Sequence, residues 1–333
     1  MKKAFNFILL LVVTIIVLFF SLKDNYEAII NTLISMDIKW LIVGFICIFM
    51  YWFLKTLPLY YFTKSHKKDF TYKSAIVLLL RTQFVNAITP FATGGQPYQV
   101  YYLNKEGIRS STSTSIILEN FIVYQIALVI LGIIAMMCNF FLHLFPHNDL
   151  LTHLITLGFI INTLVIVVSF LVAFGKNISK KLLSIGITIL SKLKIVKDKE
   201  KKLEKWNESI TNFHKSAEVL MEDKKLFFSM IFVNLIALSI LYMIPVFVLY
   251  AAGSFDKVNI GVAIITSAYV MLIGSFVPIP GGTGGLEFGF MKFYGFFIKG
   301  SLLSATMLIW RFITYYFGLM VGGIAFNVNG KKN

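Results

Sequence analysis

The same short pattern, Pro-x-x-Thr-Gly-Gly, interrupts two strongly apolar stretches of this chain. Its residues are Pro90, Thr93, Gly94 and Gly95 in the first copy and Pro280, Thr283, Gly284 and Gly285 in the second. A helix that crosses hydrocarbon satisfies its own backbone, whereas a Pro/Gly break leaves N–H and C=O groups that only neighbouring protein or a water-filled cavity can receive. Matching breaks in two halves of a chain are typical of a transporter's binding site near the middle of the membrane.

The composition places these breaks in a membrane protein. Hydrophobic residues make up 57% of the 333 residues, charged residues make up 14%, and the mean hydropathy is +0.79. Such a balance excludes a soluble domain, and several apolar runs are long enough to cross a bilayer as helices. The expected fold class is an all-α integral membrane protein, a polytopic helical bundle.

The basic residues predict how the chain threads the membrane. The net charge is +15, and the lysines crowd into a few loops between apolar runs. Because basic loops stay on the cytoplasmic side, the clusters Lys2–Lys3, Lys64–Lys73, Lys176–Lys225 and Lys331–Lys332 place both termini inside. We expect a multi-pass protein of the cell membrane, with the bacterial plasma membrane as its location.

The apolar runs between these loops predict about six full spans and two re-entrant broken hairpins. The spans are Phe7–Phe20, Trp40–Phe62, Thr114–Leu142, Leu154–Phe174, Phe227–Tyr250 and Ser301–Phe326, and the hairpins are Ser74–Leu103 and Ile260–Ile298. The first hairpin enters from the inside and the second from the outside, which is the inverted-repeat plan of alternating-access carriers. The alternative is that the pattern recurs by chance in a membrane chain rich in glycine and threonine.

A single membrane domain over residues 1–333 is expected, with a first half 1–175, a cytoplasmic linker 176–226 and a second half 227–333. In the linker, apolar residues recur at steps of three and four: Leu203, Trp206, Ile210, Phe213, Ala217 and Leu220. This spacing predicts an amphipathic helix, which either lies on the anionic inner leaflet or caps the bundle from below.

Two arginines at membrane depth are the first candidate site residues. An arginine at the centre of a membrane helix costs about 3 kcal/mol on insertion scales, and Arg81 and Arg311 each lie near a break. A guanidinium binds a phosphate or carboxylate through two parallel hydrogen bonds. We therefore expect both arginines to reach one central cavity and to bind an anionic group there. Helices that restart after Gly95 and Gly285 are expected to add free N–H groups and partial positive charge.

Two acids and several polar residues complete the expected site. Glu119 and Asn120 lie inside a predicted span, and Glu287 follows the second break. Structural ion pairs of Glu119 with Arg81 and of Glu287 with Arg311 are one alternative; the other is that these carboxylates compete with the substrate phosphate or contact a cationic headgroup. The predicted substrate-binding residues are Arg81, Arg311, Glu119, Asn120, Glu287, Thr93, Gly94, Gly95, Gln96, Thr283, Gly284 and Gly285. Lys55 and Lys292 are expected only to extend toward the interface.

Around both breaks the sequence resembles a known family. Residues 86–100 and 103–108, together with residues 278–287, are similar to the transmembrane region of lysylphosphatidylglycerol synthases, also called flippase-like membrane proteins. The resemblance spans nearly the whole chain. It implies a lipid translocase, or flippase, that moves aminoacylated phosphatidylglycerol between leaflets and so contributes to resistance against cationic antimicrobial peptides.

The resemblance also leaves alternatives. Bifunctional members carry a soluble domain that transfers lysine from tRNA, and no such domain is expected after Phe326. The chain is then expected to have no transferase activity of its own. It either acts with a separate synthase or translocates polyprenyl-linked or glycolipid precursors. A carrier of a small anion, a membrane-embedded transferase that uses Glu119 or Glu287 as a base, and an accessory subunit are the competing functions.

No catalytic residue, cofactor or metal site is expected. Gly281–Gly285 lacks the Gly-Lys-Ser/Thr of an ATP-binding loop, and Cys47 and Cys138 lie in separate apolar segments without metal-ligand spacing. The basic stretch Lys192–Lys205 contains acidic residues and no folded nucleic-acid module. The expected partners are membrane phospholipids, not nucleic acid. Three alternatives remain for the energy of transport: passive movement, proton coupling through Glu119 or Glu287, and the membrane potential.

Overall fold

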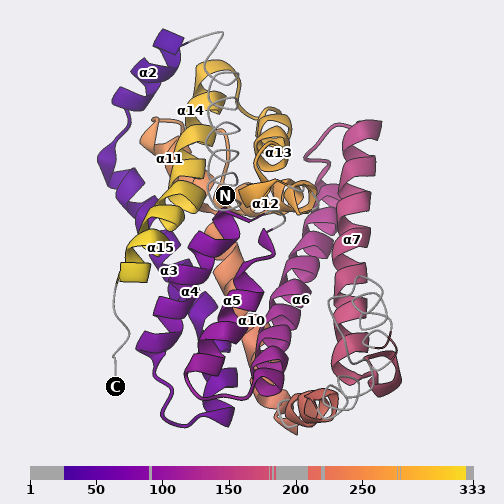
Figure 1. Ribbon diagram of the computed structural model, residues 1–333. Helices are drawn as coiled ribbons and strands as arrows, with labels where there is room; N and C mark the ends of the chain where they lie inside the picture. The colour runs from indigo at the N-terminus through magenta and orange to yellow at the C-terminus, as the bar shows by residue number, and fades with distance from the viewer. Residues whose placement is uncertain are drawn as a thin grey trace, which may run out of the picture.

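The computed structural model describes residues 26–89, 92–179, 181, 184, 209–218, 222–275, 277 and 279–327 of the chain. Every regular element in these residues is a helix, and the helices pack into one bundle (Figure 1). The all-α fold expected from the sequence is therefore confirmed.

Five helical runs in the described residues are long and apolar enough to cross a membrane. They are α3 (Ile38–His66), α6 (Ser110–Leu142), α7 (Asp149–Phe174), the pair α10 (Lys224–Tyr242) and α11 (Ile244–Ala251), and the run of α14 (Gly300–Arg311), η3 (Phe312–Tyr316) and α15 (Phe317–Asn327). Each coincides with an expected span, because long apolar runs between basic loops mark spans directly. The expected span Phe7–Phe20 lies outside the described residues. One short helix, α2 (Tyr26–Ile34), was not expected and packs against α14.

Both apolar hairpins are broken near the middle, as the repeated pattern predicts. The first consists of α4 (Tyr72–Ala87) and α5 (Gly95–Lys105), and the second of α12 (Ile260–Gly274), the short 3-10 turn η2 (Pro280–Gly282) and α13 (Gly285–Tyr294). In Figure 1, α4 and α5 occupy the lower half of the bundle and α13 lies in the upper half. Because η2 packs against α4, the two breaks meet between these halves.

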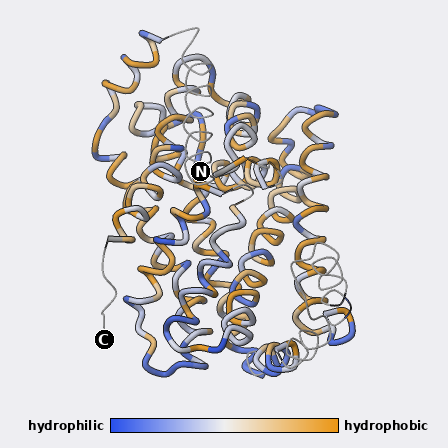
Figure 2. The backbone as a smooth tube through the Cα atoms, in the orientation of Figure 1, coloured by the Kyte–Doolittle hydropathy of each residue, from blue (hydrophilic) through white to orange (hydrophobic). Residues whose placement is uncertain are grey.

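Hydrophilic residues gather at the lower end of the bundle, where α3 and α5 end and α4 and α6 begin (Figure 2). This is the end whose lysine-rich loops are expected in the cytoplasm. Residues 209–218 of the linker are helical, and Phe213 and Ala217 among them are buried. Nδ1 of His214 lies 2.8 Å from the carbonyl oxygen of Ala173 in α7. This part of the linker therefore caps the bundle; the other linker residues lie outside the described ones, except 176–179, 181, 184 and 222–226.

A close approach between α7 and α12 fixes the second hairpin. A Cβ added to Gly158 of α7 would lie 2.2 Å from the backbone oxygen of Leu272 in α12. Nearby, the Asn162 amide donates to Ser275 Oγ, just after α12, at 2.7 Å, and accepts from Gln125 of α6 at 3.2 Å. These contacts hold the broken end of α12 against two full spans, and so they position the break that follows.

We expect Gly158→Ala to destabilise the protein, because the added methyl must push α7 away from α12, and overpacking of this kind costs about 1–3 kcal/mol. Gly132→Ala is the matched control. Gly132 of α6 faces the side chain of the same Leu272, where an added Cβ would meet its nearest atom at an ordinary 3.5 Å. Thermal unfolding in detergent, followed by tryptophan fluorescence, measures both variants. Equal unfolding temperatures would contradict the close approach.

Candidate functional site

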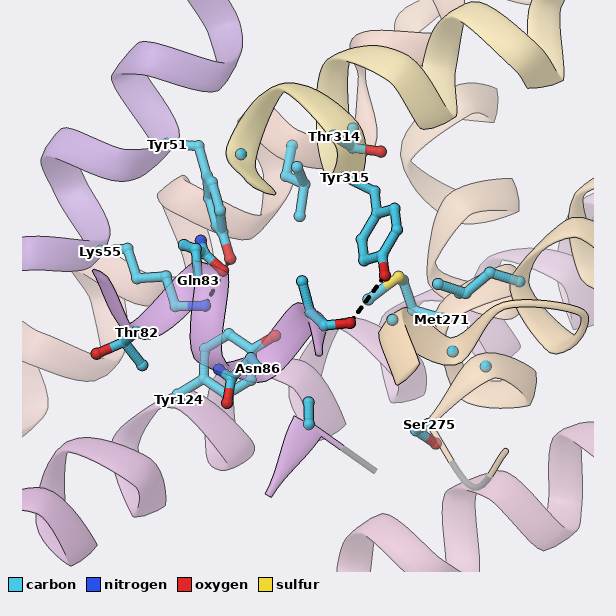
Figure 3. A pocket seen from close by; sticks show the side chains of 18 of the residues that line it. Tyr51, Lys55, Thr82, Gln83, Asn86, Tyr124, Met271, Ser275, Thr314 and Tyr315 are labelled. Atoms are coloured by element: carbon cyan, nitrogen blue, oxygen red, sulfur yellow. Dashed lines mark hydrogen bonds between the residues drawn. The ribbon is translucent and has the colours of Figure 1, made fainter. Parts of the chain in front are cut away.

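A cavity of about 510 Å³ lies where the two breaks meet (Figure 3). Its walls come from α3, α4, α5, α6, α10, α12 and the helices around η3. Residues of both breaks line it: Ala92 and Thr93 from the first, followed by Gln96 of α5, and Val277, Ile279 and Gly281 from the second. Backbone that leaves regular helix thus borders a shared cavity, which is the arrangement that a membrane tolerates.

The first break is closed by side chains from the end of α4. Thr89 Oγ1 accepts a hydrogen bond from the Gly94 N–H at 3.1 Å, and Asn86 Oδ1 accepts from the Gly95 N–H at 2.9 Å. A Cβ on Gly95 would lie 2.2 Å from Asn86 Oδ1, so glycine permits this close approach. The expectation that α5 restarts with free N–H groups needs correction at both glycines, because Thr89 and Asn86 already accept hydrogen bonds from their N–H groups.

The backbone of the second break has a different conformation, although its Thr-Gly-Gly sequence is the same. Gly281, Gly282 and Gly284 have φ angles of +68°, +64° and +88°. Residues other than glycine rarely adopt positive φ angles. The Gly284 N–H donates to Glu287 Oε2 at 2.6 Å. The N-terminus of α13 is therefore capped by its own carboxylate, so the Gly284 N–H is not free for a ligand either.

Arg311 holds the second break together from the cavity wall. Its Nε pairs with Glu287 Oε1 at 2.7 Å, and its Nη2 donates to Gly281 O at 3.2 Å and to Thr283 Oγ1 at 3.4 Å. The guanidinium also lies 4.5 Å from the centre of the Tyr315 ring. Arg311 is only 4% exposed. The ion pair between Glu287 and Arg311, which the sequence offered as the structural alternative, is present.

Tyr315 joins the second break to the first hairpin. It belongs to η3, a π-helix that follows Arg311 directly, and π-helical turns occur often at functional sites. The Tyr315 hydroxyl donates to the carbonyl of Ala87, the last residue of α4, at 3.0 Å. Its ring lies against Gly281, where an added Cβ would sit 2.2 Å from the nearest ring atom. One aromatic side chain therefore contacts both hairpins.

The expectation that Arg81 shares the cavity with Arg311 needs correction. The cavity face of α4 consists of Leu79, Thr82, Gln83 and Asn86, whose spacing marks one side of a helix, and Arg81 lies on the other side. Its Nε donates to the carbonyl of Ala325 in α15 at 2.9 Å, and its guanidinium packs against the rings of Tyr102 and Phe326. Arg81 thus joins α4 to α15 rather than lining the cavity.

Glu119 is displaced from the cavity for the same reason. On α6 the cavity face consists of Ile117, Asn120, Phe121 and Tyr124, so Glu119 lies on the opposite side of the helix. It is 1% exposed, and its Oε1 accepts from Ser115 Oγ at 3.0 Å, whereas Oε2 has no hydrogen-bond partner. Within the described residues Glu119 forms no ion pair, so the pairing with Arg81 considered from the sequence is absent.

The other predicted residues fall into two groups. Arg311, Asn120, Thr93 and Gln96 line the cavity. The remainder shape or hold the breaks beside it: Gly94, Gly95, Thr283, Gly284, Gly285 and Glu287. The structure therefore brings most of the predicted set to one place, and only Arg81 and Glu119 face elsewhere.

Lys55 is a cavity residue that the sequence reasoning treated as interfacial. It lines the cavity from α3, where its Nζ donates to the Tyr51 hydroxyl at 2.8 Å and lies 4.6 Å from the centre of the Tyr124 ring. Figure 3 shows Lys55 and the two tyrosines together, with Gln83 and Asn86 of α4 beside them. The available signal was a lysine placed well inside an apolar span and four residues after a tyrosine.

The chemistry of the cavity suits a polar, negatively charged guest. Among its described lining residues the charged ones are Lys55 and Arg311, both cationic, and no aspartate or glutamate is among them. Amides and hydroxyls supply neutral hydrogen-bonding groups from several helices: Thr82, Gln83, Asn86, Gln96, Gln99, Asn120 and Asn234. Groups of this kind bind phosphates and sugar-like hydroxyls.

Comparison with known proteins covers almost the whole chain. The family model described as lysylphosphatidylglycerol synthase TM region matches residues 6–322. A protein of Archaeoglobus fulgidus described as a UPF0104 membrane protein is 24% identical over 308 residues, which cover 88% of this chain and 87% of that protein. Both breaks and the described lining residues of the cavity lie inside the region that the family model matches.

The Arg311–Glu287 pair generates a double-mutant test. Arg311→Gln or Glu287→Gln alone strands a buried charge, which costs about 3–5 kcal/mol, whereas Glu287→Gln/Arg311→Gln removes both charges and keeps an acceptor for the Gly284 N–H. We expect each single variant to unfold at a lower temperature in detergent than the double variant. A double variant whose losses are the sum of the single losses would contradict the coupling.

Proposed function

The chain belongs to the family of the lysylphosphatidylglycerol synthase transmembrane region, and we propose that it is a lipid translocase that moves an anionic or aminoacylated phospholipid between the two leaflets. Phosphatidylglycerol and lysyl-phosphatidylglycerol are its proposed substrates. The observation that carries the proposal is the central cavity, which both membrane breaks line and whose charged wall residues are cationic. The proposed setting is the cell membrane, with both termini in the cytoplasm.

The size of the cavity supports a headgroup as the guest. Cavities that bind drug-sized molecules have volumes of about 300–1,000 Å³, and the volume of this cavity is about 510 Å³. A headgroup fits this space, whereas two acyl chains do not, so the chains would remain in the bilayer during transfer. The protein then has to lower only the largest free-energy barrier of the crossing, which is the passage of a charged phosphate through hydrocarbon.

The two broken hairpins support alternating access. They approach the cavity from different halves of the bundle (Figure 1), and carriers with this plan rock one repeat against the other around a fixed site. Near that site the Tyr315 hydroxyl of η3 bonds to Ala87 at the end of α4, and the same ring packs on Gly281 of the second hairpin. In this proposal Arg311, Asn120, Thr93 and Gln96 contact the headgroup as it passes. Arg81 instead positions α4 against α15.

The biological consequence follows from the charge of the lipid. Aminoacylated phosphatidylglycerol in the outer leaflet makes the surface less negative, so cationic antimicrobial peptides bind it less strongly. A separate lipid-modifying synthase would supply this lipid, and it is the partner that the proposal implies. Polyprenyl-linked and glycolipid precursors offer a similar phosphate and are the alternative cargo.

A leaflet assay tests the proposal. The purified full chain is reconstituted in phosphatidylcholine vesicles that contain trace fluorescent lysyl-phosphatidylglycerol, phosphatidylglycerol, phosphatidylcholine or a polyprenyl phosphate, and dithionite reports the share that reaches the outer leaflet. We expect the two glycerol lipids to cross faster than phosphatidylcholine, by about 10-fold or more, equivalent to about 1.4 kcal/mol in barrier height.

Two tryptophan variants of α6 provide the control. Asn120→Trp fills the cavity and is expected to abolish the acceleration, whereas Ile134→Trp, on the exposed side of the same helix, is expected to retain it. Wild-type rates equal to those of protein-free vesicles for all four lipids would overturn the proposal. Uptake of free phosphate without any lipid movement would identify a small-anion carrier instead.

A further inference from the structure

We propose that Lys55 is the group that binds the guest's phosphate in the central cavity, and that the guest is a headgroup with net negative charge rather than an aminoacylated, cationic one. This inference rests on the proposed function and narrows its substrate class. It assigns to Lys55 the anion-binding role that the sequence gave to Arg81 and Arg311.

Aromatic side chains position the Lys55 ammonium group. Nζ donates to the Tyr51 hydroxyl at 2.8 Å and lies 5.2 Å from the centre of the Tyr51 ring and 4.6 Å from that of Tyr124. Both tyrosines also line the cavity. Aromatic faces attract an ammonium without neutralising its charge. An ammonium has three N–H donors, and Tyr51 accepts from one of them, so donors remain for a guest.

The three cations near the breaks differ in what already compensates their charge. Arg311 pairs with Glu287 and donates to two further oxygens, and Arg81 lies outside the cavity lining. Lys55 has no carboxylate within ion-pair distance among the described residues. Because Lys55 is part-buried and no carboxylate offsets its charge, an arriving anion gains most at Lys55.

The charge of the whole cavity selects the class of guest. With Arg311 neutralised by Glu287, Lys55 leaves the described lining with one uncompensated positive charge. A phosphodiester supplies one negative charge, which matches it. The amino groups of a lysylated headgroup would need carboxylates, and Glu287, which alone among the described carboxylates pairs with a lining cation, is committed to Arg311. The cavity therefore suits phosphatidylglycerol better than its lysylated form.

Neutral donors stand beside the ammonium. Gln83 and Asn86 of α4 line the cavity next to Lys55 and Tyr124 (Figure 3), and Asn120 of α6 lines it as well. Their amide N–H groups are suited to the phosphate oxygens that the single lysine does not reach. Lys55 thus supplies the charge, and the amides supply the remaining hydrogen bonds.

The same helix offers a matched control. Lys64 also follows a tyrosine by four residues: its Nζ donates to the Tyr60 hydroxyl at 2.7 Å and lies 5.0 Å from the centre of that ring. It is exposed near the end of α3 and does not line the cavity. Lys55→Gln and Lys64→Gln therefore each remove a lysine–tyrosine contact within α3, one inside the cavity and one outside it, and Lys55→Gln also removes the contact with Tyr124.

The experiment measures binding and translocation with the full chain. Radiolabelled short-chain phosphatidylglycerol is bound to purified wild type, Lys55→Gln, Lys55→Arg and Lys64→Gln, with lysyl-phosphatidylglycerol, phosphatidylcholine and inorganic phosphate as competitors. We expect Lys55→Gln to weaken binding of phosphatidylglycerol by 10-fold or more, Lys55→Arg to retain most of it, and Lys64→Gln to match wild type. We expect lysyl-phosphatidylglycerol to compete more weakly than unlabelled phosphatidylglycerol.

Further readouts separate this role from a structural one. Lys55→Gln strands no charge and loses only the Tyr51 and Tyr124 contacts, so its unfolding temperature in detergent is expected to fall slightly at most, whereas a lysine needed for folding would give a large loss. Competition by inorganic phosphate as strong as that by phosphatidylglycerol would support phosphate binding at Lys55 but assign a free anion as its source, and so overturn the lipid assignment.

Failure of the inference is distinguishable from failure of the proposed function. If wild type moves lipid in vesicles and Lys55→Gln binds and moves it as well as Lys64→Gln does, the inference is overturned and translocation stands. If lysyl-phosphatidylglycerol binds as tightly as phosphatidylglycerol, the choice of a net-anionic guest is overturned. If binding depends on Lys55 but no lipid crosses, the binding site is supported and the translocase proposal falls.

Discussion

Every backbone polar group inside hydrocarbon needs a partner, and the two interrupted hairpins show how this chain meets that requirement. A helix that stops at mid-membrane leaves its last carbonyls and the next helix's first N–H groups without intrahelical bonds. In the first hairpin Asn86 and Thr89 receive the N–H groups of Gly95 and Gly94. In the second, Glu287 receives that of Gly284, and Arg311 donates to the carbonyl of Gly281. The cavity exists because these side chains let the helices stop there.

The two hairpins meet the same requirement with different chemistry. The first uses neutral amide and hydroxyl groups, while the second uses a buried ion pair and three glycines in left-handed conformations. Removing one partner of a buried ion pair is more damaging than removing a neutral hydrogen bond. The second break is therefore expected to be more sensitive than the first to the loss of a single side-chain partner.

Much of the fold could be predicted from the sequence, because hydropathy and lysine placement report spans directly. The limits of α6 and α7 differ from the predicted spans by only a few residues, and both breaks occur where glycine and proline interrupt apolar runs. The direction in which individual side chains point was harder to predict than the spans. Arg81 and Glu119 each lie one or two positions away from cavity residues, and at 3.6 residues per turn such a small offset points a side chain to the opposite face. The cavity position of Lys55 was not predicted, because only its Tyr51 contact is local in the sequence, whereas Tyr124 comes from α6.

The hydrogen bond between Tyr315 and Ala87 has a consequence for motion. A single hydroxyl–carbonyl bond contributes only about 1 kcal/mol, and this one joins η3 to the end of α4. A bond of this strength favours the packing of the two elements but does not lock it. Since the Tyr315 ring also packs on Gly281 and Arg311, any shift of α4 that breaks this bond would also remove one restraint on the ring that lies against the second break.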